Sequence, residues 1–577
     1  MIRPEVPGGS SVARWGAAAL GTILALAGLA RAGADPDPND AIAKGRDLFL
    51  REWFPGEGTR PGGDGLGPVY NDTSCVACHG LGGPGGAGPS NKNAEILTAV
   101  RSGLTAVVRQ LDEQARALQA AEAKSKPAEK LELQARKGEP APKRPGTTDG
   151  PAATEASRES KQDTQLTRVQ PVKPDLETHE GPNLEISPDG LTRVQPVKPD
   201  LEKLAELHPA FRSARSITLH LFSTDPNYPA WRARLLGLNN QGKPAQGKGP
   251  VATEKDRTSA DVLAIRQQVA SRPANKLPRV QHGAFTLVLS RRNPPALFGA
   301  GLIDAIPESV IEEGLRKTFP EFPEIQGRVN RLPDGSIGRF GWKAQTASLK
   351  EFVLTACAVE LGLEVPDHPQ GKLPQVPQRQ GLKPGLDLDA AECDALIAFV
   401  RNLAPPTQRR PSSPRQAQTV QEGRKRFEEA GCATCHTPKL GKVDRVFSDL
   451  LLHDMGPELA DNGVYGGDSS DPEADPPAAM SAVPGRAQGG AAVAVKGRRG
   501  ASRQEWRTPP LWGFRDTAPY LHDGRAATLE EAVAFHGGQA ARSAEKFFQL
   551  PPEQRRAVEI FLKSLTAPAA TELAQAH

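Results

Sequence analysis

The chain is poor in aromatic residues and carries little net charge for its length. Only 5% of its 577 residues are aromatic, and it holds 3 methionines and 6 cysteines against 57 glycines and 54 prolines. This composition predicts modest helices joined by long loops, and the length allows two to four domains. The formal net charge of +4 gives no indication of a nucleic-acid or membrane-surface partner, so no nucleic-acid partner is predicted.

Long hydrophobic runs are also scarce, and the one that stands out is Trp15 to Ala30 near the N-terminus. Arg3 and Arg14 precede this run, and Ala32-Gly33-Ala34 follows it. The order basic, apolar and Ala-x-Ala is typical of a secretory signal, and the run is too short for an ordinary spanning helix. We predict a signal peptide over residues 1–34 that is cleaved after Ala34, a periplasmic location, and no integral membrane segment afterwards. An uncleaved anchor is the alternative.

Four of the cysteines lie in two Cys-x-x-Cys-His motifs, one at Cys75 to His79 and one at Cys432 to His436. In such a motif two thiols add across the vinyl groups of one haem, and the adjacent imidazole binds the iron. A thioredoxin-like dithiol and half of a zinc site are the alternatives. A redox dithiol has no use for the histidine, and neither motif supplies a second ligand pair at zinc spacing.

The duplicated motif therefore predicts two covalently attached c-type haems with iron centres. Export fits this prediction, because thioether haems are normally attached outside the bacterial cytoplasm. The predicted attachment residues and proximal ligands are Cys75, Cys78 and His79 for the first haem and Cys432, Cys435 and His436 for the second.

The two remaining cysteines, Cys357 and Cys393, each lie in a helix-like stretch. In an oxidising compartment they could form a disulfide. Two buried thiols are the alternative.

Similar segments precede and follow each motif, which indicates a duplicated module. Gly-Arg-x-x-Phe occurs at Gly45 to Phe49 before the first motif and at Gly423 to Phe427 before the second. Apolar residues at helical spacing predict a closing helix at Leu388 to Leu403 and another at Pro552 to Leu565.

The predicted fold class is therefore mainly α, with two c-type cytochrome-like domains, long loops and a disordered insertion. The first domain spans residues 35–406 and the second spans 415–568. A linker at 407–414, rich in Pro, Ser and Arg, joins them, and a tail follows at 569–577.

The first domain is too long for one haem module, and composition locates the excess at about residues 111–203. This stretch is rich in Ala, Glu, Lys, Pro and Gln with almost no aromatics, so it cannot bury enough apolar surface to offset its ordering entropy. The segment Leu166 to Glu177 recurs unchanged at Leu191 to Glu202, which favours a recent duplication in a disordered insertion. Leu111 to Ala135 is predicted to form a transient charged helix, and Gly466 to Ala501 is a second loose stretch.

Six further segments resemble the bacterial di-haem oxidoreductase family, peroxidases related to the di-haem cytochrome c peroxidases. The resemblance covers most of 40–100 and 280–566, and the insertion at 111–203 departs from the family pattern. The segments are Asn71 to Cys75, Pro295 to Pro307, Gly338 to Ala344, Asp449 to Gly456, Glu505 to Gly513 and Leu521 to Ala526.

The resemblance implies two cytochrome c folds that face each other, with haems close enough to exchange electrons. In the peroxidase relatives the C-terminal haem stores an electron and the N-terminal haem meets peroxide. Those relatives end a Leu-x-x-Ala-Val helix with the distal ligand of the C-terminal haem, and here Thr528 to His536 places His536 there, where the peroxidases usually have Met. Bis-imidazole ligation would lower the potential of that haem.

Several other residues are candidates for roles around the haems. Met455 is the alternative distal ligand of the second haem, and Met480 is a weaker one; the first haem has no clear distal ligand. Each of the other candidates has either a haem contact or a structural role. The possible distal ligands of the first haem are His208, His220 and His282. The possible propionate contacts are His453, His522, Arg507 and Arg525, and the tryptophans that could lie between or over the haems are Trp342 and Trp512.

These features predict a periplasmic di-haem oxidoreductase of the peroxidase type that passes electrons between its two haems. Its expected partners are a small electron-donor protein or a quinol-linked donor, with hydrogen peroxide as the oxidant. The catalytic base would be a Glu or His over the first haem, which the sequence does not identify. The alternatives are a non-catalytic electron-transfer cytochrome and a relative that oxidises a protein or a small organic substrate.

Overall fold

The computed structural model describes residues 38–101, 184–186, 192–194, 201–238, 259–283, 285–375, 385–466 and 500–569. The chain divides into two compact units, one of residues 1–102 with 202–577 and one of residues 103–201. In the second unit the described residues are two short antiparallel strands, β3 (Leu184–Ile186) and β4 (Thr192–Val194). This strand pair was not predicted. Residues 201–203 of the predicted insertion begin helix α5 (Leu201–Leu207). The rest of the insertion with its expected helix at 111–135, the signal peptide and the stretch at 467–499 lie outside the described residues.

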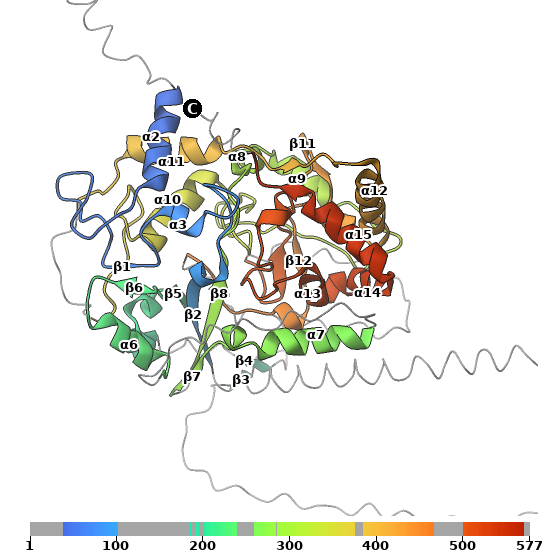
Figure 1. The fold of residues 1–577 in the computed structure, drawn as a ribbon. Helices are drawn as coiled ribbons and strands as arrows, with labels where there is room; N and C mark the ends of the chain where they lie inside the picture. Colours follow the sequence, from blue (N-terminus) through green and yellow to red (C-terminus); the bar gives the residue numbers. More distant parts are fainter. Residues whose placement is uncertain are drawn as a thin grey trace, which may run out of the picture. The chain divides into compact units, whose positions relative to one another are not determined.

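The first motif lies beside a packed pair of helices, α2 (Pro38–Leu50) and α11 (Ala390–Arg401), seen in Figure 1. A Cβ atom added at Gly45 would lie 1.9 Å from the carbonyl oxygen of Ala395, so the two backbones approach too closely for any side chain. One turn later the rings of Phe49 and Phe399 pack at 5.2 Å. This contact explains the Gly-Arg-x-x-Phe segment, and α11 confirms the first closing helix.

The second motif has a matching pair, α12 (Pro414–Glu429) and α15 (Pro552–Lys563). A Cβ atom at Gly423 would again lie 1.9 Å from a carbonyl oxygen, that of Ala557. The rings of Phe427 and Phe561 pack at 5.7 Å. The second closing helix is thereby confirmed, and the same glycine and phenylalanine serve the same contact in both halves of the chain.

A four-stranded antiparallel sheet, which the prediction of a mainly α fold did not include, follows the first motif in sequence. Its order is β5-β2-β8-β7, with β2 (Ala94–Arg101) and β8 (Phe285–Arg292) paired along their full length and Leu97 opposite Leu289. The outer strands are β5 (Ser216–Thr218) and β7 (Arg279–His282). The fold is thus helical with a substantial strand component.

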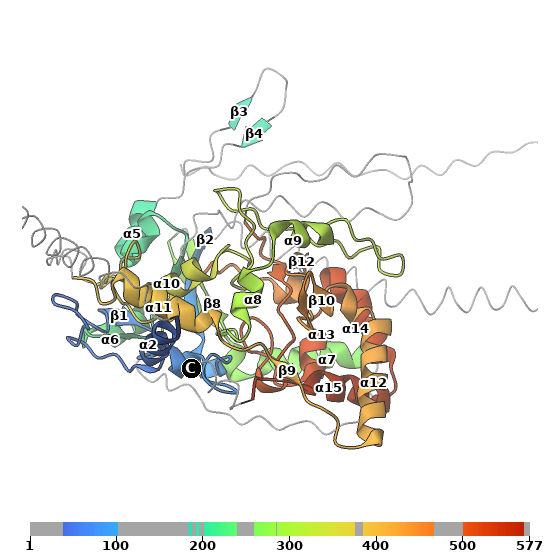
Figure 2. The ribbon, with the colours of Figure 1, turned by 90° about the horizontal axis from the view of Figure 1, so that it is seen from above.

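The sheet strand β8 leads straight into the apolar cluster around α2 and α11. This first cluster also takes in α8 (Ala300–Asp304), α9 (Glu308–Gly314) and α10 (Leu349–Glu360). In both Figure 1 and Figure 2, α8 lies between the two helix pairs. The second cluster surrounds α12, α14 (Ala541–Gln549) and α15.

One helix from the first half of the sequence packs on the second half. Helix α7 (Ser259–Ser271) lies against α13 (Leu529–Ala534) and α14, as Figure 1 shows. Arg272 at its C-terminal end forms a bidentate pair with Glu531. Sequence order alone therefore does not separate the two halves in space.

The remaining elements are short. They are β1 (Val69–Tyr70) paired with β6 (Phe222–Ser223), β10 (Lys439–Leu440) with β11 (Val443–Asp444), β12 (Leu452–Asp454) with β13 (Glu505–Arg507), β9 (Thr407–Gln408) with β14 (Leu565–Thr566), and helices α3 (Cys75–Cys78), α5 (Leu201–Leu207) and α6 (Tyr228–Leu235). Strand β9 falls within the predicted linker at 407–414, so part of that segment is paired with the end of the second half.

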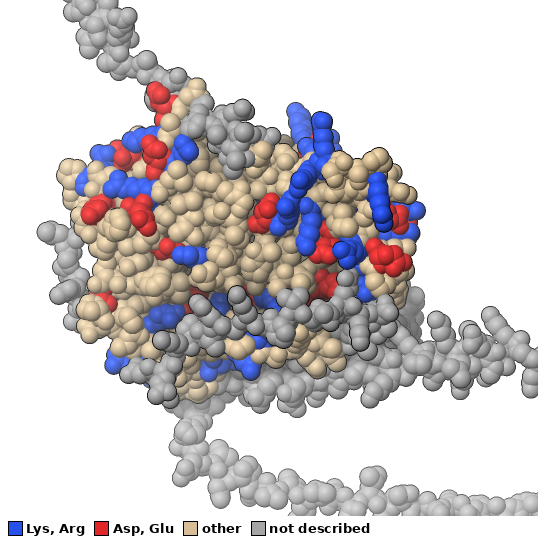
Figure 3. Space-filling model, viewed as in Figure 1, with Lys and Arg blue, Asp and Glu red and all other residues tan. Residues whose placement is uncertain are grey.

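Charges of both signs are interspersed on the face seen in Figure 3, with a stretch largely free of charged side chains in its middle. Within the described ranges, no helix combines the length and the apolar character that a membrane span needs.

Candidate haem-binding sites

A cavity of about 260 Å³ lies next to the second motif. Its lining includes Cys432, Cys435 and His436 from the motif, together with His536 and Met455. The motif turns sharply into this wall because Gly431 takes a positive φ of 84° before the short 3-10 turn Cys432–Thr434. Both candidates for the distal position thus face the same space as the motif histidine.

Two of the histidines that line this cavity, His436 and His536, are held in the same tautomer. The Nδ1 of His436 lies 3.1 Å from the carbonyl oxygen of Phe447, and the Nδ1 of His536 lies 2.8 Å from that of Ala532. A carbonyl oxygen only accepts, so Nδ1 carries the hydrogen and Nε2 keeps a lone pair. Burial lowers the pKa of His436 to about 4 and also lowers that of His536, so both rings stay neutral at pH 7.

The first motif shows the same arrangement. Ser74 caps the short helix α3 by accepting from the backbone NH of Ala77. The Nδ1 of His79 donates to the carbonyl oxygen of Pro295 at 3.0 Å, and burial lowers the pKa of His79 to about 4. Its Nε2 is therefore also left as the lone-pair nitrogen.

These observations fit a haem at each motif. Metal-binding histidines usually donate their second ring nitrogen to a carbonyl or carboxylate, which orients the ring and makes the ligand more basic. All three imidazoles meet this condition with backbone carbonyls. Burial raises the pKa of Cys75 and Cys432 to about 12, so both thiols stay protonated in the free protein at pH 7.

A buried cation at the cavity beside the second motif also fits a haem there. Arg507 lines the cavity with only 6% of its surface exposed, and its recorded hydrogen bonds go to the backbone carbonyls of Gly341 and Thr508. Desolvation lowers its pKa to about 10. An anionic group such as a haem propionate would compensate this charge. Arg525, in contrast, is already paired with Asp523 at 2.6 Å.

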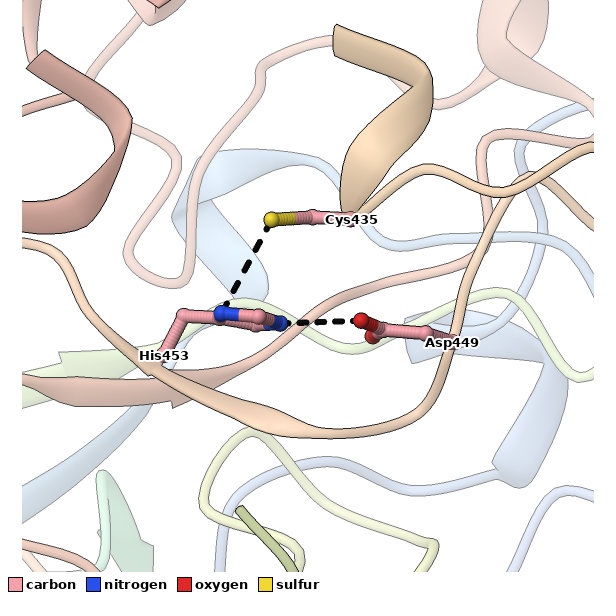
Figure 4. A group of neighbouring side chains, drawn as sticks. All are labelled: Cys435, Asp449 and His453. Carbon is pink, nitrogen blue, oxygen red and sulfur yellow. Dashed lines mark hydrogen bonds and ion pairs between the residues drawn. The ribbon is translucent and has the colours of Figure 1, made fainter. Parts of the chain in front are cut away.

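Next to the second motif three side chains form the chain shown in Figure 4. The Nε2 of His453 lies 2.9 Å from Oδ2 of Asp449, and its Nδ1 lies 3.7 Å from Sγ of Cys435. His453 Nδ1 also lies 2.9 Å from Oε1 of Gln539. Cysteine, aspartate and histidine at this spacing form a potential metal site, but the predicted thioether uses the sulfur of Cys435. The contacts of His453 favour an orienting role beside the motif.

Two tryptophans and a histidine named in the sequence analysis line the same cavity: Trp342, Trp512 and His522. The ring of His522 stacks on Trp506, with ring centres 3.7 Å apart. The indole NH of Trp342 donates to the carbonyl oxygen of Asn293 at 2.9 Å. Asn293 stands two residues before Pro295, the hydrogen-bond partner of His79, so Trp342 joins the cavity wall to the first motif.

The three histidines considered for the first haem are engaged elsewhere. His208 accepts from the backbone NH of Ala210, and the Nε2 atoms of His220 and His282 lie 2.9 Å and 3.3 Å from the carbonyl oxygens of Val359 and Leu235. The nitrogen Nε2, which is left as the lone-pair nitrogen in His79 and His436, is engaged by a carbonyl oxygen in His220 and His282, and this difference favours structural roles. Met480 lies outside the described residues.

Two residues near the first motif had no sequence signal. Glu360 ends α10, and its main-chain oxygen accepts from the backbone NH of Asn71 at 2.7 Å. Tyr465 donates its phenol hydrogen to Oε1 of Glu360. The two are more than a hundred residues apart and belong to no motif, so only the folded chain brings them together.

Cys357 and Cys393 are both buried, and both are free thiols. Of the two alternatives for this pair, the structure has the buried thiols. Burial is the main cause that raises the pKa of Cys357 well above its ordinary value.

Comparison with known proteins gives a family match. The family model described as "Di-haem oxidoreductase, putative peroxidase" matches residues 285–469 and 490–565. The matched residues include the second motif and His536, whereas the first motif precedes them. No curated protein sequence matches the chain.

Two solved structures are similar at 17% identity. One is a MauG-like protein associated with microbial copper homeostasis, with 47% of this chain and 93% of that chain covered and a TM-score of 0.23. The other is the hydrazine synthase of Kuenenia stuttgartiensis pressurised with 20 bar of xenon, with 57% and 99% covered and a TM-score of 0.21.

Proposed function

We propose that this chain, of which residues 285–469 and 490–565 match the di-haem oxidoreductase family model, is an exported c-type cytochrome of the peroxidase type, with one covalently bound haem in each of two cytochrome c-like domains. It reduces hydrogen peroxide in the periplasm with electrons from a small donor protein or a quinol-linked donor. The first haem is held by Cys75, Cys78 and His79, and the second by Cys432, Cys435 and His436.

The observation that carries this proposal is the link between the two sites. Trp342 lines the cavity of the second site, and its indole NH reaches Asn293. Two residues on, Pro295 accepts the Nδ1 hydrogen of His79. A short chain of hydrogen bonds and covalent bonds thus connects the proximal ligand of the first site with the wall of the second, which supports electron exchange between the sites.

At the second site the chain offers two neutral imidazoles with lone pairs on Nε2, from His436 and His536. When bound, the two haems would supply peroxide-reactive iron at the first site and a stored electron at the second. His536 is the proposed distal ligand of the second haem, and Met455 on the same cavity wall is the alternative.

At the first site Glu360 is the proposed proton carrier. Its carboxylate accepts from Asn71, which stands at the start of the segment that leads into the first motif. Burial is the main cause that raises the pKa of Glu360, which makes it a better base than an exposed glutamate. Peroxide reduction needs a group of this kind to move a proton between the two oxygens.

The alternative function is electron transfer without turnover, which two imidazole ligands at the second site would also suit. The test is to reduce the purified holoprotein partially and to record the spin state of each haem before and after adding hydrogen peroxide. We expect the first haem to be high-spin and to react, while the second stays low-spin. Two low-spin haems that ignore peroxide would reject the enzyme and leave the electron carrier.

A variant separates the two sites in the same experiment. Cys75→Ser with Cys78→Ser removes the first attachment and leaves the second motif intact. We expect this protein to keep one low-spin haem and to lose the reaction with peroxide. A reaction of undiminished rate would assign peroxide chemistry to the second site.

A further inference from the structure

The loop Asp461 to Tyr465, which follows the second motif in sequence, is fixed against the sheet that follows the first. Asp461 and Arg292 form a buried ion pair at 2.8 Å, with side-chain exposures of 8% and 6%. The backbone NH of Val464 donates to the hydroxyl of Ser216 at 2.8 Å. These contacts hold Tyr465, at the end of the loop, in a defined place.

The phenol of Tyr465 meets a carboxylate that is itself oriented. Its OH donates to Oε1 of Glu360 at 2.5 Å, and the side-chain amide of Asn71 donates to Oε2 at 2.7 Å. The residue after Asn71 is Asp72, whose Oδ2 accepts from Sγ of Cys78 at 3.6 Å. The Tyr465 and Glu360 pair is therefore linked, through Asn71 and the adjacent Asp72, to the surroundings of Cys78, one of the two cysteines that would attach the first haem.

A buried phenol is hard to oxidise unless its proton can leave with the electron, because a charged intermediate is costly in a low-dielectric interior. Glu360 provides an acceptor in direct contact with the phenol. Burial is the leading cause that raises the pKa of both groups, so the phenol keeps its hydrogen at rest while the carboxylate becomes a stronger base.

The other tyrosines are placed differently. The chain has 4 tyrosines, and the phenols of Tyr228 and Tyr520 donate to the backbone carbonyls of His220 and Phe514. A carbonyl oxygen cannot take up a proton near neutral pH. Tyr70 stacks on Phe222 instead.

We propose that Tyr465 is a redox-active tyrosine that donates one electron to the first haem site. The inference rests on the proposed function, which supplies hydrogen peroxide as the oxidant. The phenol O–H bond would break, the proton would pass to Oε1 of Glu360, and the electron would pass to the first site, where a haem held by His79 would supply the peroxide-oxidised acceptor. Tyr465 is oxidised to a neutral tyrosyl radical, and the site is reduced by one electron.

This step matters when the second haem has no electron to give. Peroxide takes two electrons as it is reduced to water. If both irons are ferric at the start, one electron would come from the haem bound at the first site and the other from Tyr465. If the second haem is reduced beforehand, it supplies that electron and Tyr465 stays intact.

In the experiment, fully ferric holoprotein is mixed with hydrogen peroxide and frozen for electron paramagnetic resonance. The protein is produced in cells supplied either with ring-deuterated tyrosine or with ordinary tyrosine. We expect an organic radical whose hyperfine splitting narrows with the deuterated ring, and at least a fivefold weaker signal in protein whose second haem was reduced first. Tyr465→Phe should lose the signal. The matched control Tyr228→Phe, also a buried phenol, should keep it.

The outcomes separate this inference from the proposed function. If both variants hold two haems and peroxide still changes the spectrum of the first haem, a radical that persists in Tyr465→Phe, or no tyrosyl radical in the unmutated protein, overturns the role of Tyr465 alone. If peroxide changes neither haem, the proposed function fails and the role of Tyr465 fails with it.

Discussion

His536 is the residue on which the chemistry of the second site depends. Its ring lines the same cavity as His436, with Nδ1 donating to Ala532 and Nε2 left for iron. We expect His536→Ala to give a second haem that is high-spin and binds carbon monoxide when reduced, because one axial position is then open. Optical spectra of the ferrous protein with and without carbon monoxide measure this.

Met455→Leu is the matched control, since Met455 lines the same wall and leucine keeps the packing. The second haem should stay low-spin in this variant. An unchanged spectrum in His536→Ala together with a changed one in Met455→Leu would transfer the ligand role to Met455.

Glu505 gives a prediction for pH dependence at the residue scale. Burial alone would raise its pKa, but the hydrogen bonds and charge of Arg328 outweigh burial and lower the pKa from 4.5 to about 2. The group thus contributes stability that is fully present above about pH 4.5 and is lost as the pH falls through about 2. The shift corresponds to about 3 kcal/mol.

The measurement compares the free energy of unfolding of the unmutated protein and Glu505→Gln between pH 7 and pH 2.5. The variant should be less stable at pH 7, and the difference should shrink as the solution is acidified. Glu324→Gln, at an exposed position, serves as the control and should show no such trend. A difference that is constant with pH would mean that the pair with Arg328 does not depress the pKa.

At the scale of elements, we expect glycine-to-alanine changes in the two helix pairs to destabilise the protein, although helix propensity alone would predict stabilisation. Replacing a helical glycine by alanine usually stabilises by up to about 1 kcal/mol. At Gly423 the added Cβ would lie 1.9 Å from the carbonyl oxygen of Ala557, so α12 and α15 must move apart. We expect Gly423→Ala to destabilise by about 1–3 kcal/mol and to lower the occupancy of the second haem before the first.

Gly45→Ala should also destabilise the protein, but it should lower the occupancy of the first haem before the second, because its Cβ would meet the carbonyl of Ala395 on α11. Gln418→Ala, at an exposed position of α12, should be neutral or slightly stabilising. Thermal unfolding and haem content per chain test these variants together. Equal losses of both haems in Gly423→Ala would contradict two separately packed helix pairs.

The helix pairs also show what the sequence could predict. The Gly-Arg-x-x-Phe segments and the apolar spacing of Leu388 to Leu403 and Pro552 to Leu565 are local patterns, and α2, α11, α12 and α15 confirm the helices they indicate. The sheet was missed because β2 and β8 are far apart in sequence and pair only through long-range contacts. Strand preference depends on such contacts more than on the residues themselves.

The candidate sites divide in the same way. The motif residues Cys75 to His79 and Cys432 to His436 carry a local signature, and the position of His536 came from the family resemblance. Glu360 and Tyr465 had neither a local signature nor a counterpart in the resemblance, because their contact joins the end of α10 to the distant loop Asp461 to Tyr465. A carboxylate has no distinctive sequence pattern until folding gives it a partner.

At the scale of the whole molecule, the insertion offers a test of the domain assignment. The insertion at about 111–203 is predicted to be disordered, and α5, which begins at its end, supplies the buried Leu204. We expect a protein in which residues 111–183 are replaced by a short Gly-Ser linker to bind both haems. Its free energy of unfolding should lie within about 0.5 kcal/mol of that of the full chain. Loss of either haem in this variant would show that the insertion belongs to a haem domain.

The central claim is that each chain carries two haems joined through sulfur. The most direct measurement is the pyridine haemochrome spectrum of the exported protein after denaturation and acid extraction, together with the mass of the intact chain. We expect two thioether-linked haems per polypeptide and a start at Asp35, with Cys432→Ser plus Cys435→Ser reducing the number to one. A colourless polypeptide after extraction, with the mass of the bare chain, would contradict the account.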